Sequence, residues 1–158
     1  NTPGSCDGDV VYFGGEAETL AAGQVVHYNS SGNWELVDPS NSTKSVGLIG
    51  IILGSDASVH GVLLRGMVTH DHDPGEVGQA LYLKATGDIS SIAPTGSGNI
   101  VRVVGYCLDA SNGQIWFNPD SSISKVVPAA TAFVIGGERV ARLPVPEPLF
   151  PTFISIPR

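Results

Sequence analysis

The sequence of 158 residues predicts an all-β fold: a compact antiparallel barrel or sandwich built from two repeated β-units, with a C-terminal hairpin and an extended proline-rich arm. Three observations favour it. Short apolar runs rich in Val, Ile, Tyr and Phe are separated every few residues by 20 glycines and 11 prolines. The runs have strand lengths of about 5–6 residues, and none repeats apolar residues at helical spacing. The second half of the chain also matches the first.

The strands are expected, in chain order, in the runs DVVYF, GQVVHY, SVGLIGIIL, HGVLLRGMV, ALYLK, NIVRVVGYCL, GQIWF, TAFVI, ERVARL and TFISI. The segments SSGN at 30–33 and TGD at 86–88 are typical of hairpin loops, and Gly136–Gly137 of a two-residue hairpin turn. Regular turn signals between short strands favour a barrel or sandwich over a parallel sheet.

The internal repeat appears when the chain is shifted by 55 positions, which carries Gly23 onto Gly78. Residues 23–53 then align without a gap over residues 78–108, and the identical pairs fall mostly at turns. Apolar positions agree as well, as for Trp34 with Ile89. Turn residues in one register indicate the same backbone path twice, so we expect two superposable strand–turn–strand–loop–strand units.

These patterns divide the chain into three parts. A duplicated β-domain is expected over 1–122, with units near 10–68 and 65–122, followed by a hairpin over 123–143 and an extended arm over 144–158. Five prolines in the arm forbid a helix or a central strand, and the segment is too apolar for a solvated tail. We therefore expect it to bind another protein chain through Leu149, Phe150, Phe153, Ile154 and Ile156. The alternative is that the arm folds back on its own domain as a final edge strand.

Composition excludes several classes of function. The net charge is −7 and the eight basic residues are scattered, so no direct contact with nucleic acid is expected. No apolar run approaches the ~20 residues of a membrane span, so no membrane partner is expected. Two cysteines are too few for a disulfide framework, and Cys107, inside the run VRVVGYCLD, is predicted to be a buried thiol.

The segment THDHDPGE at 69–76 is the one candidate metal site. On a strand, His70 and His72 would share one face and Asp71 would lie on the other. With Glu76, the two histidines resemble the first motif of the cupins, a β-barrel family that holds Fe, Mn or Zn through imidazoles and a carboxylate.

The rest of the cupin pattern is missing. Leu64 stands where the motif has glycine, and Asn99 where its second histidine segment is expected. The repeat also places Asp71 on Glu16, so the acids belong to the lead-in turn of each unit. We therefore expect no tightly bound metal at His70, His72 and Glu76. With no G-x-S-x-G segment, P-loop or cysteine cluster either, we expect no catalytic residue, no cofactor and no enzyme.

The phrase GQALYLKATGDISSIAPTGSGNIVRVVGYCLD, followed by GQIWFNPDSS, resembles a module of virion structural proteins in tailed bacteriophages. The resemblance covers residues 75–122. The module occurs in capsid decoration (cement) proteins and in head or tail fibres, so the resemblance implies a non-enzymatic particle protein. Ile123 stands where the module often carries an aromatic residue, and further β-structure follows it.

Within that resemblance we favour a capsid decoration protein that binds and stabilises the outer capsid surface. The chain is short, has no heptads or collagen-like shaft, and ends in an arm suited to clamping neighbours. The implied partner is the major capsid protein, the implied assembly a homo-oligomer with a trimer favoured, and the implied location the capsid surface of the virion after synthesis in the host cytoplasm. The alternatives are a tail or head fibre component and, from another class, a cupin-like metal-dependent enzyme.

Overall fold

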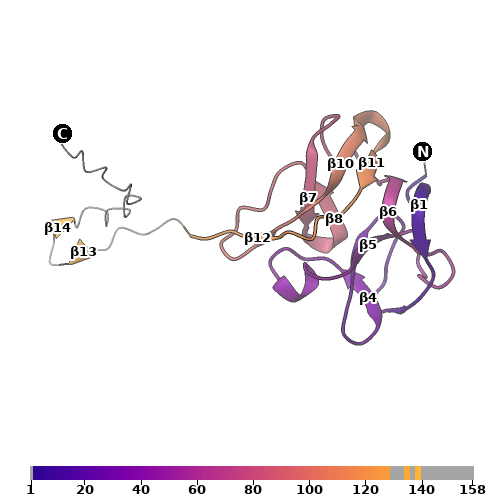
Figure 1. Cartoon of the computed structure of the whole chain (residues 1–158), viewed down its shortest axis with the longest axis horizontal. Helices are drawn as coiled ribbons and strands as arrows, with labels where there is room; N and C mark the ends of the chain where they lie inside the picture. Colours follow the sequence, from indigo (N-terminus) through magenta and orange to yellow (C-terminus); the bar gives the residue numbers. More distant parts are fainter. Residues whose placement is uncertain (1, 129–133, 136–137, 140–158) are drawn as a thin grey trace, which may run out of the picture. The chain divides into compact units, whose positions relative to one another are not determined.

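The computed structural model describes residues 2–128, 134–135 and 138–139 (Figure 1). The chain divides into two compact units, Asn1–Val127 and Pro128–Arg158. No helix in the described part of the chain is long and apolar enough to cross a membrane.

The first unit is built on one ten-stranded sheet. Its strands are β1 (Cys6–Val11), β2 (Gly15–Glu16), β3 (Val25–Tyr28), β4 (Asn33–Leu36), β5 (Ile49–Ile52), β6 (Val62–Thr69), β7 (Ala80–Lys84), β8 (Asp88–Ser90), β10 (Val103–Asp109) and β11 (Gln114–Phe117). They follow the order β2-β4-β3-β5-β6-β11-β10-β7-β8. β1 pairs with β6 and lies beside it in Figure 1.

The predicted all-β class is confirmed. The helices among the described residues are three single-turn 3-10 segments, η1 (Ser42–Lys44), η2 (Ala85–Gly87) and η3 (Ala110–Asn112). The sheet is open, running from β2 at one end to β8 at the other, so a closed barrel is not formed. The β2–β4 pair is parallel and the other pairs of this sheet are antiparallel.

The first half of the unit (β1 to β6) and the second half (β7 to β11) pair their strands in the same order. One reads β4-β3-β5-β6 and the other β8-β7-β10-β11, and β6 pairs with β11 where they meet. The registers also correspond. Val26 lies opposite Gly50 in the first half, and Leu81 lies opposite Gly105 in the second. These are the residue pairs that the 55-residue shift superposes.

The central strands are apolar on both faces because they separate two hydrophobic clusters. Successive side chains on a strand point to opposite faces. Val25 and Ile51 therefore join a cluster shared by both halves, while Val26 and Ile52 join a second cluster around Trp34. The shared cluster contains Val25, Val37, Ile49, Ile51, Leu63 and Val68 from the first half, and Leu81, Leu83, Ile89, Val104, Cys107, Ile115 and Phe117 from the second. The cluster around Trp34 lies within the first half alone, while the shared cluster needs residues from both halves.

Cys107 is buried as predicted, with 1% of its surface exposed. Burial is the main cause that raises the pKa of its thiol, and Asp73 and Asp109 add to the rise. A thiol that stays protonated is a poor nucleophile, so Cys107 acts as a packing residue.

The C-terminal part of the chain is less regular. β12 (Ser124–Lys125) pairs with β9 (Ile100–Val101), and the first compact unit extends to Val127. In the second unit β13 (Val134–Ile135) pairs antiparallel with β14 (Glu138–Arg139), as expected for a hairpin. The turn residues 136–137 and the arm, with its proposed contact residues Leu149, Phe150, Phe153, Ile154 and Ile156, lie outside the described residues.

A buried cation connects the two halves. Arg102 is 6% exposed and donates from Nε to the carbonyl oxygen of Asp120, at 2.7 Å. Its Nη1 donates to the carbonyl oxygens of Ser45, at 3.2 Å, and Gly47, at 3.1 Å. One side chain therefore donates to carbonyl groups of two distant segments, residues 45–47 and Asp120.

We expect Arg102→Met to destabilise the fold by roughly 1–3 kcal/mol, because it leaves the buried carbonyl group of Ser45 without a donor. Urea denaturation of the two proteins measures the difference. Arg65→Met is the control: Arg65 is exposed, with its guanidinium 5.9 Å from the Trp116 ring, and its loss should cost about 1 kcal/mol or less. Equal effects of the two substitutions would contradict the structural role of Arg102.

Gly50 and Gly105, an identical pair of the repeat, are required by close contact between strands. A Cβ at Gly105 would overlap the carbonyl oxygen of Trp116, and one at Gly50 would overlap the Val62 side chain and lie 2.9 Å from the carbonyl oxygen of Leu63. The same local constraint therefore operates in both halves.

Gly50→Ala and Gly105→Ala should each destabilise the protein by about 1–3 kcal/mol, the usual range for overpacking a close-packed interior. Thermal unfolding monitored by circular dichroism measures the effect. Gly15→Ala serves as the control, since its Cβ would meet only the side-chain tip of Asn33, which can turn aside. If Gly105→Ala left the stability unchanged, the strands would be able to move apart without a cost in free energy.

Candidate functional site

The segment that carries the two histidines leaves the sheet at the end of β6. β6 ends at Thr69, and the backbone N–H of His70 donates to the carbonyl oxygen of Gly113 at 2.8 Å. Gly113 has a φ of 64°, and a Cβ there would lie 2.8 Å from the carbonyl oxygens of both His70 and His72. The turn after β10 therefore holds the histidine segment in place from one side.

His70 is buried, with 2% of its side chain exposed. Its Nδ1 lies 3.0 Å from the carbonyl oxygen of Gly23. A carbonyl oxygen only accepts, so Nδ1 carries a hydrogen and donates. The other ring nitrogen, Nε2, faces two carboxylate oxygens: Oδ1 of Asp88 at 3.2 Å and Oδ1 of Asp71 at 3.3 Å.

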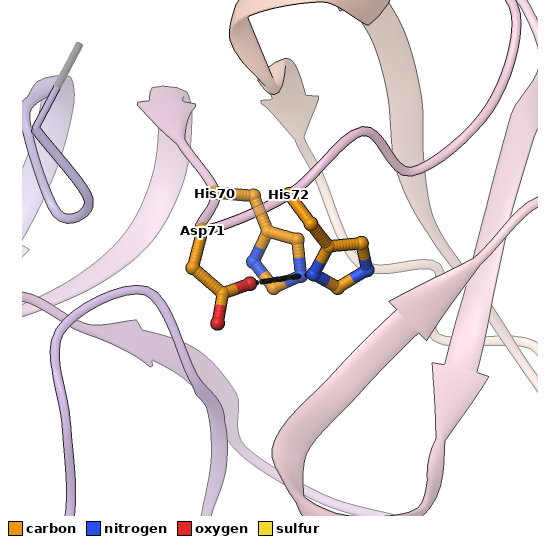
Figure 2. Close-up of side chains that lie close together, drawn as sticks. All are labelled: His70, Asp71 and His72. Carbon is orange, nitrogen blue, oxygen red and sulfur yellow. Dashed lines mark hydrogen bonds and ion pairs between the residues drawn. The ribbon is translucent and has the colours of Figure 1, made fainter.

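His72 also has both ring nitrogens close to oxygen atoms, but it is half-exposed, with 43% of its side chain accessible. Its Nδ1 lies 2.6 Å from Oδ1 of Asp71, and its Nε2 lies 3.2 Å from Oδ1 of Asp88. The ring centroids of His70 and His72 are 4.4 Å apart. Figure 2 shows the two rings and the Asp71 carboxylate turned toward one another.

Asp88, the first residue of β8, completes the cluster. Its Oδ1 accepts from the backbone N–H of Ile89 at 2.8 Å, and its Oδ2 accepts from Lys84 Nζ at 2.6 Å. Burial alone would raise the pKa of Asp88. The bonds from Lys84, Ile89 and His70 outweigh burial and lower the pKa. The carboxylate is therefore held in its charged form beside the two rings.

The cluster lies between two open hollows on the protein surface. One, of about 290 Å³, is lined by Pro3, Thr69, His70, Asp71, His72, Asp73, Ser111, Asn112 and Gly113. The other, of about 220 Å³, is lined by Gln24, His70, Asp71, His72, Thr86, Gly87 and Asp88. A small solute can thus reach the cluster from either side.

The structure changes the membership of the predicted site. Ligand atoms of His70, Asp71 and His72 lie within 4.8 Å of one another, and Glu76 is not part of this group. Asp71 was expected on the opposite face, but strand alternation stops with β6 at Thr69, so it turns toward the histidines. Glu76 is exposed, and its backbone N–H donates to Gln79 Oε1 at 2.9 Å.

Sequence reasoning missed Asp88, which it treated as part of a hairpin loop. The signal that could have found it is the repeat register. The 55-residue shift carries His70 back to Gly15 and Asp88 back to Asn33. Gly15 and Asn33 are paired neighbours between β2 and β4, so the equivalent positions in the second half were candidates for the same contact.

A second group of titratable side chains surrounds His27 in β3. His27 is 9% exposed, and its Nδ1 lies 3.5 Å from Glu35 Oε1. Lys44 Nζ lies 3.1 Å from Glu35 Oε2. Burial is the largest cause that lowers the pKa of His27. Glu35 acts in the opposite direction, while Arg102 and Lys44 lower the pKa further.

The sign of this shift predicts a pH dependence of stability. Because the pKa of His27 is lower in the folded protein, the unfolded chain takes up the proton first as pH falls below about 6.5. The contribution of neutral His27 to stability should therefore decline from pH 7 toward pH 5. Urea denaturation across this range should show a smaller decline for His27→Gln than for the wild type. An identical decline in both proteins would exclude this role.

No protein-family model, curated protein or solved structure matches the chain.

Proposed function

We propose that the protein is a non-enzymatic structural component of a tailed-phage particle, and that it acts as a capsid decoration protein on the outer capsid surface. The observation that carries the proposal is the phage-like phrase of residues 75–122, whose strands β7, β8, β10 and β11 make up one complete half of the main sheet. The phrase thus spans four neighbouring strands of the sheet.

We further propose that the two halves are copies of one β-unit. Their common strand order and the matching Val26–Gly50 and Leu81–Gly105 registers support this duplication. A duplicated, rigid β-unit with a shared core suits a protein whose role is mechanical support. In such a role, the polar side chains of the protein would stabilise the fold and bind partner proteins, and none would take part in catalysis.

The attachment device in this proposal is the arm of residues 144–158. Its partners would be sister subunits, with a trimer favoured, and the major capsid protein. Full burial of Phe150, Phe153, Ile154 and Ile156 would contribute roughly 6–12 kcal/mol before ordering costs, at about 1.5–3 kcal/mol for each side chain. Ordering costs about 1–2 kcal/mol per residue of backbone, and the five prolines reduce this because their φ is already fixed.

Two alternatives compete with capsid decoration. A tail or head fibre component would use the same β-unit at another place on the particle. A cupin-like metal-dependent enzyme draws support from the convergence of His70 and His72. Against it stand the open sheet and the absence of Glu76 from the histidine cluster.

Deletion of residues 144–158 tests the attachment proposal. The truncated protein should keep the unfolding temperature of the full chain in its monomeric state, and its affinity for capsids lacking the protein should fall at least tenfold. Co-sedimentation with purified capsids measures binding, and analytical ultracentrifugation measures self-association.

The control keeps the arm and its prolines but replaces Phe150, Phe153, Ile154 and Ile156 with serine, and it should lose binding in the same way. Unfolding of the truncated domain, combined with a stable monomeric full chain that does not bind, would contradict the proposal. Binding to tails or fibres instead of capsids would support the fibre alternative.

A further inference from the structure

We propose that His70, His72 and Asp88 bind a divalent transition-metal ion of the Zn²⁺ class, with Asp71 orienting His72. This site is independent of the proposed role in a phage particle. It also uses a different set of residues from the His70–His72–Glu76 motif considered in the sequence.

The first argument is that both imidazoles face the same carboxylate oxygen. Nε2 of His70 and Nε2 of His72 each lie 3.2 Å from the same oxygen, Oδ1 of Asp88. In a tetrahedral zinc site the metal–ligand distances are about 2.0–2.2 Å, which places neighbouring ligand atoms about 3.3 Å apart. The spacing of each imidazole nitrogen from the carboxylate oxygen is therefore that of two ligands on one ion.

The second argument is the orientation of both imidazole rings. Metal-binding histidines usually donate their other N–H to a backbone carbonyl or a carboxylate, which fixes the ligating tautomer. His70 Nδ1 donates to the carbonyl oxygen of Gly23 at 3.0 Å, and His72 Nδ1 lies 2.6 Å from Oδ1 of Asp71. Both rings are thus held with Nε2 directed at Asp88. A backbone carbonyl orients His70, and a carboxylate orients His72.

The surroundings suit a cation with an open coordination position. Lys84 neutralises the outer oxygen of Asp88, while Oδ1, which accepts from the backbone N–H of Ile89, faces the two rings. Asp71 Oδ1, 3.3 Å from His70 Nε2, or a water from either flanking hollow can complete the coordination. Two imidazoles and a carboxylate suit Zn²⁺, Co²⁺ or Ni²⁺ better than Mg²⁺ or Ca²⁺, which prefer oxygen ligands throughout.

The ion would cross-link segments that are distant in the sequence. His70 and His72 belong to the connection that leads from β6 to β7, Asp88 begins β8, and Gly23 lies just before β3. The sequence argument against a metal rested on a missing further ligand and on acids that belong to the repeat. Asp88 supplies a further ligand from the second half. We infer a structural metal site, with the ion binding the folded state in preference to the unfolded chain.

Metal titration of the full-length protein tests this inference. After treatment with a chelator, the protein should bind about one equivalent of Co²⁺ and develop the visible absorption bands of four-coordinate cobalt. Zn²⁺ at about a hundredfold excess over its Kd should raise Tm by roughly 5–10 °C. His72→Ala and Asp88→Asn should each reduce affinity for both ions at least tenfold and abolish the Tm increase.

The control is His60→Ala, which removes an exposed histidine whose Nδ1 lies 3.2 Å from the carbonyl oxygen of Asp56. This variant should retain both the cobalt spectrum and the Tm increase. The comparison uses the difference in Tm with and without metal, so a lower starting stability of a variant does not affect it. Absence of cobalt bands in the wild type, or metal binding that persists in both His72→Ala and Asp88→Asn, would overturn the inference.

Discussion

The antiparallel pairing of β6 with β11 is the constraint on which the rest of the structure depends. It sets Thr69 opposite Gln114 and Gly66 opposite Phe117, and so joins two four-stranded arrangements into one sheet. Each arrangement has an apolar face that needs cover from water, and the cluster containing Ile51 from one half and Leu81 from the other provides it. The histidine segment begins where β6 ends, so the same pairing also fixes the position of the candidate site.

The features that the sequence predicted correctly are local ones. Short apolar runs between glycines and prolines identified an all-β chain, because strand length and turn chemistry are encoded within a few residues. The matching positions of Gly50 and Gly105 reflect a steric requirement that is felt at each strand contact. The open sheet and the burial of Arg102 were not predicted, because both depend on segments far apart in the chain. Nothing in the residues around Arg102 indicates that Ser45 and Gly47 supply its acceptors.

The candidate site follows the same division. His70 and His72 were found because they are close in sequence, but the local motif suggested Glu76 as the third member and the fold supplies Asp88 instead. Strand alternation predicted that Asp71 would point away from the histidines. This does not apply, because β6 ends at Thr69, before Asp71. The partner-binding function assigned to the arm rests on its composition, since residues 144–158 lie outside the described part of the chain.

Arg102 has a consequence for how the halves stay together in acid. Its acceptors are backbone carbonyl groups, which do not titrate, and although burial lowers the pKa of Arg102, a guanidinium keeps its charge in proteins. The junction between residues 45–47 and residue 120 therefore does not depend on the gain or loss of a proton, because its donor keeps its charge and its acceptors do not titrate. This contact between the two halves should persist in acid.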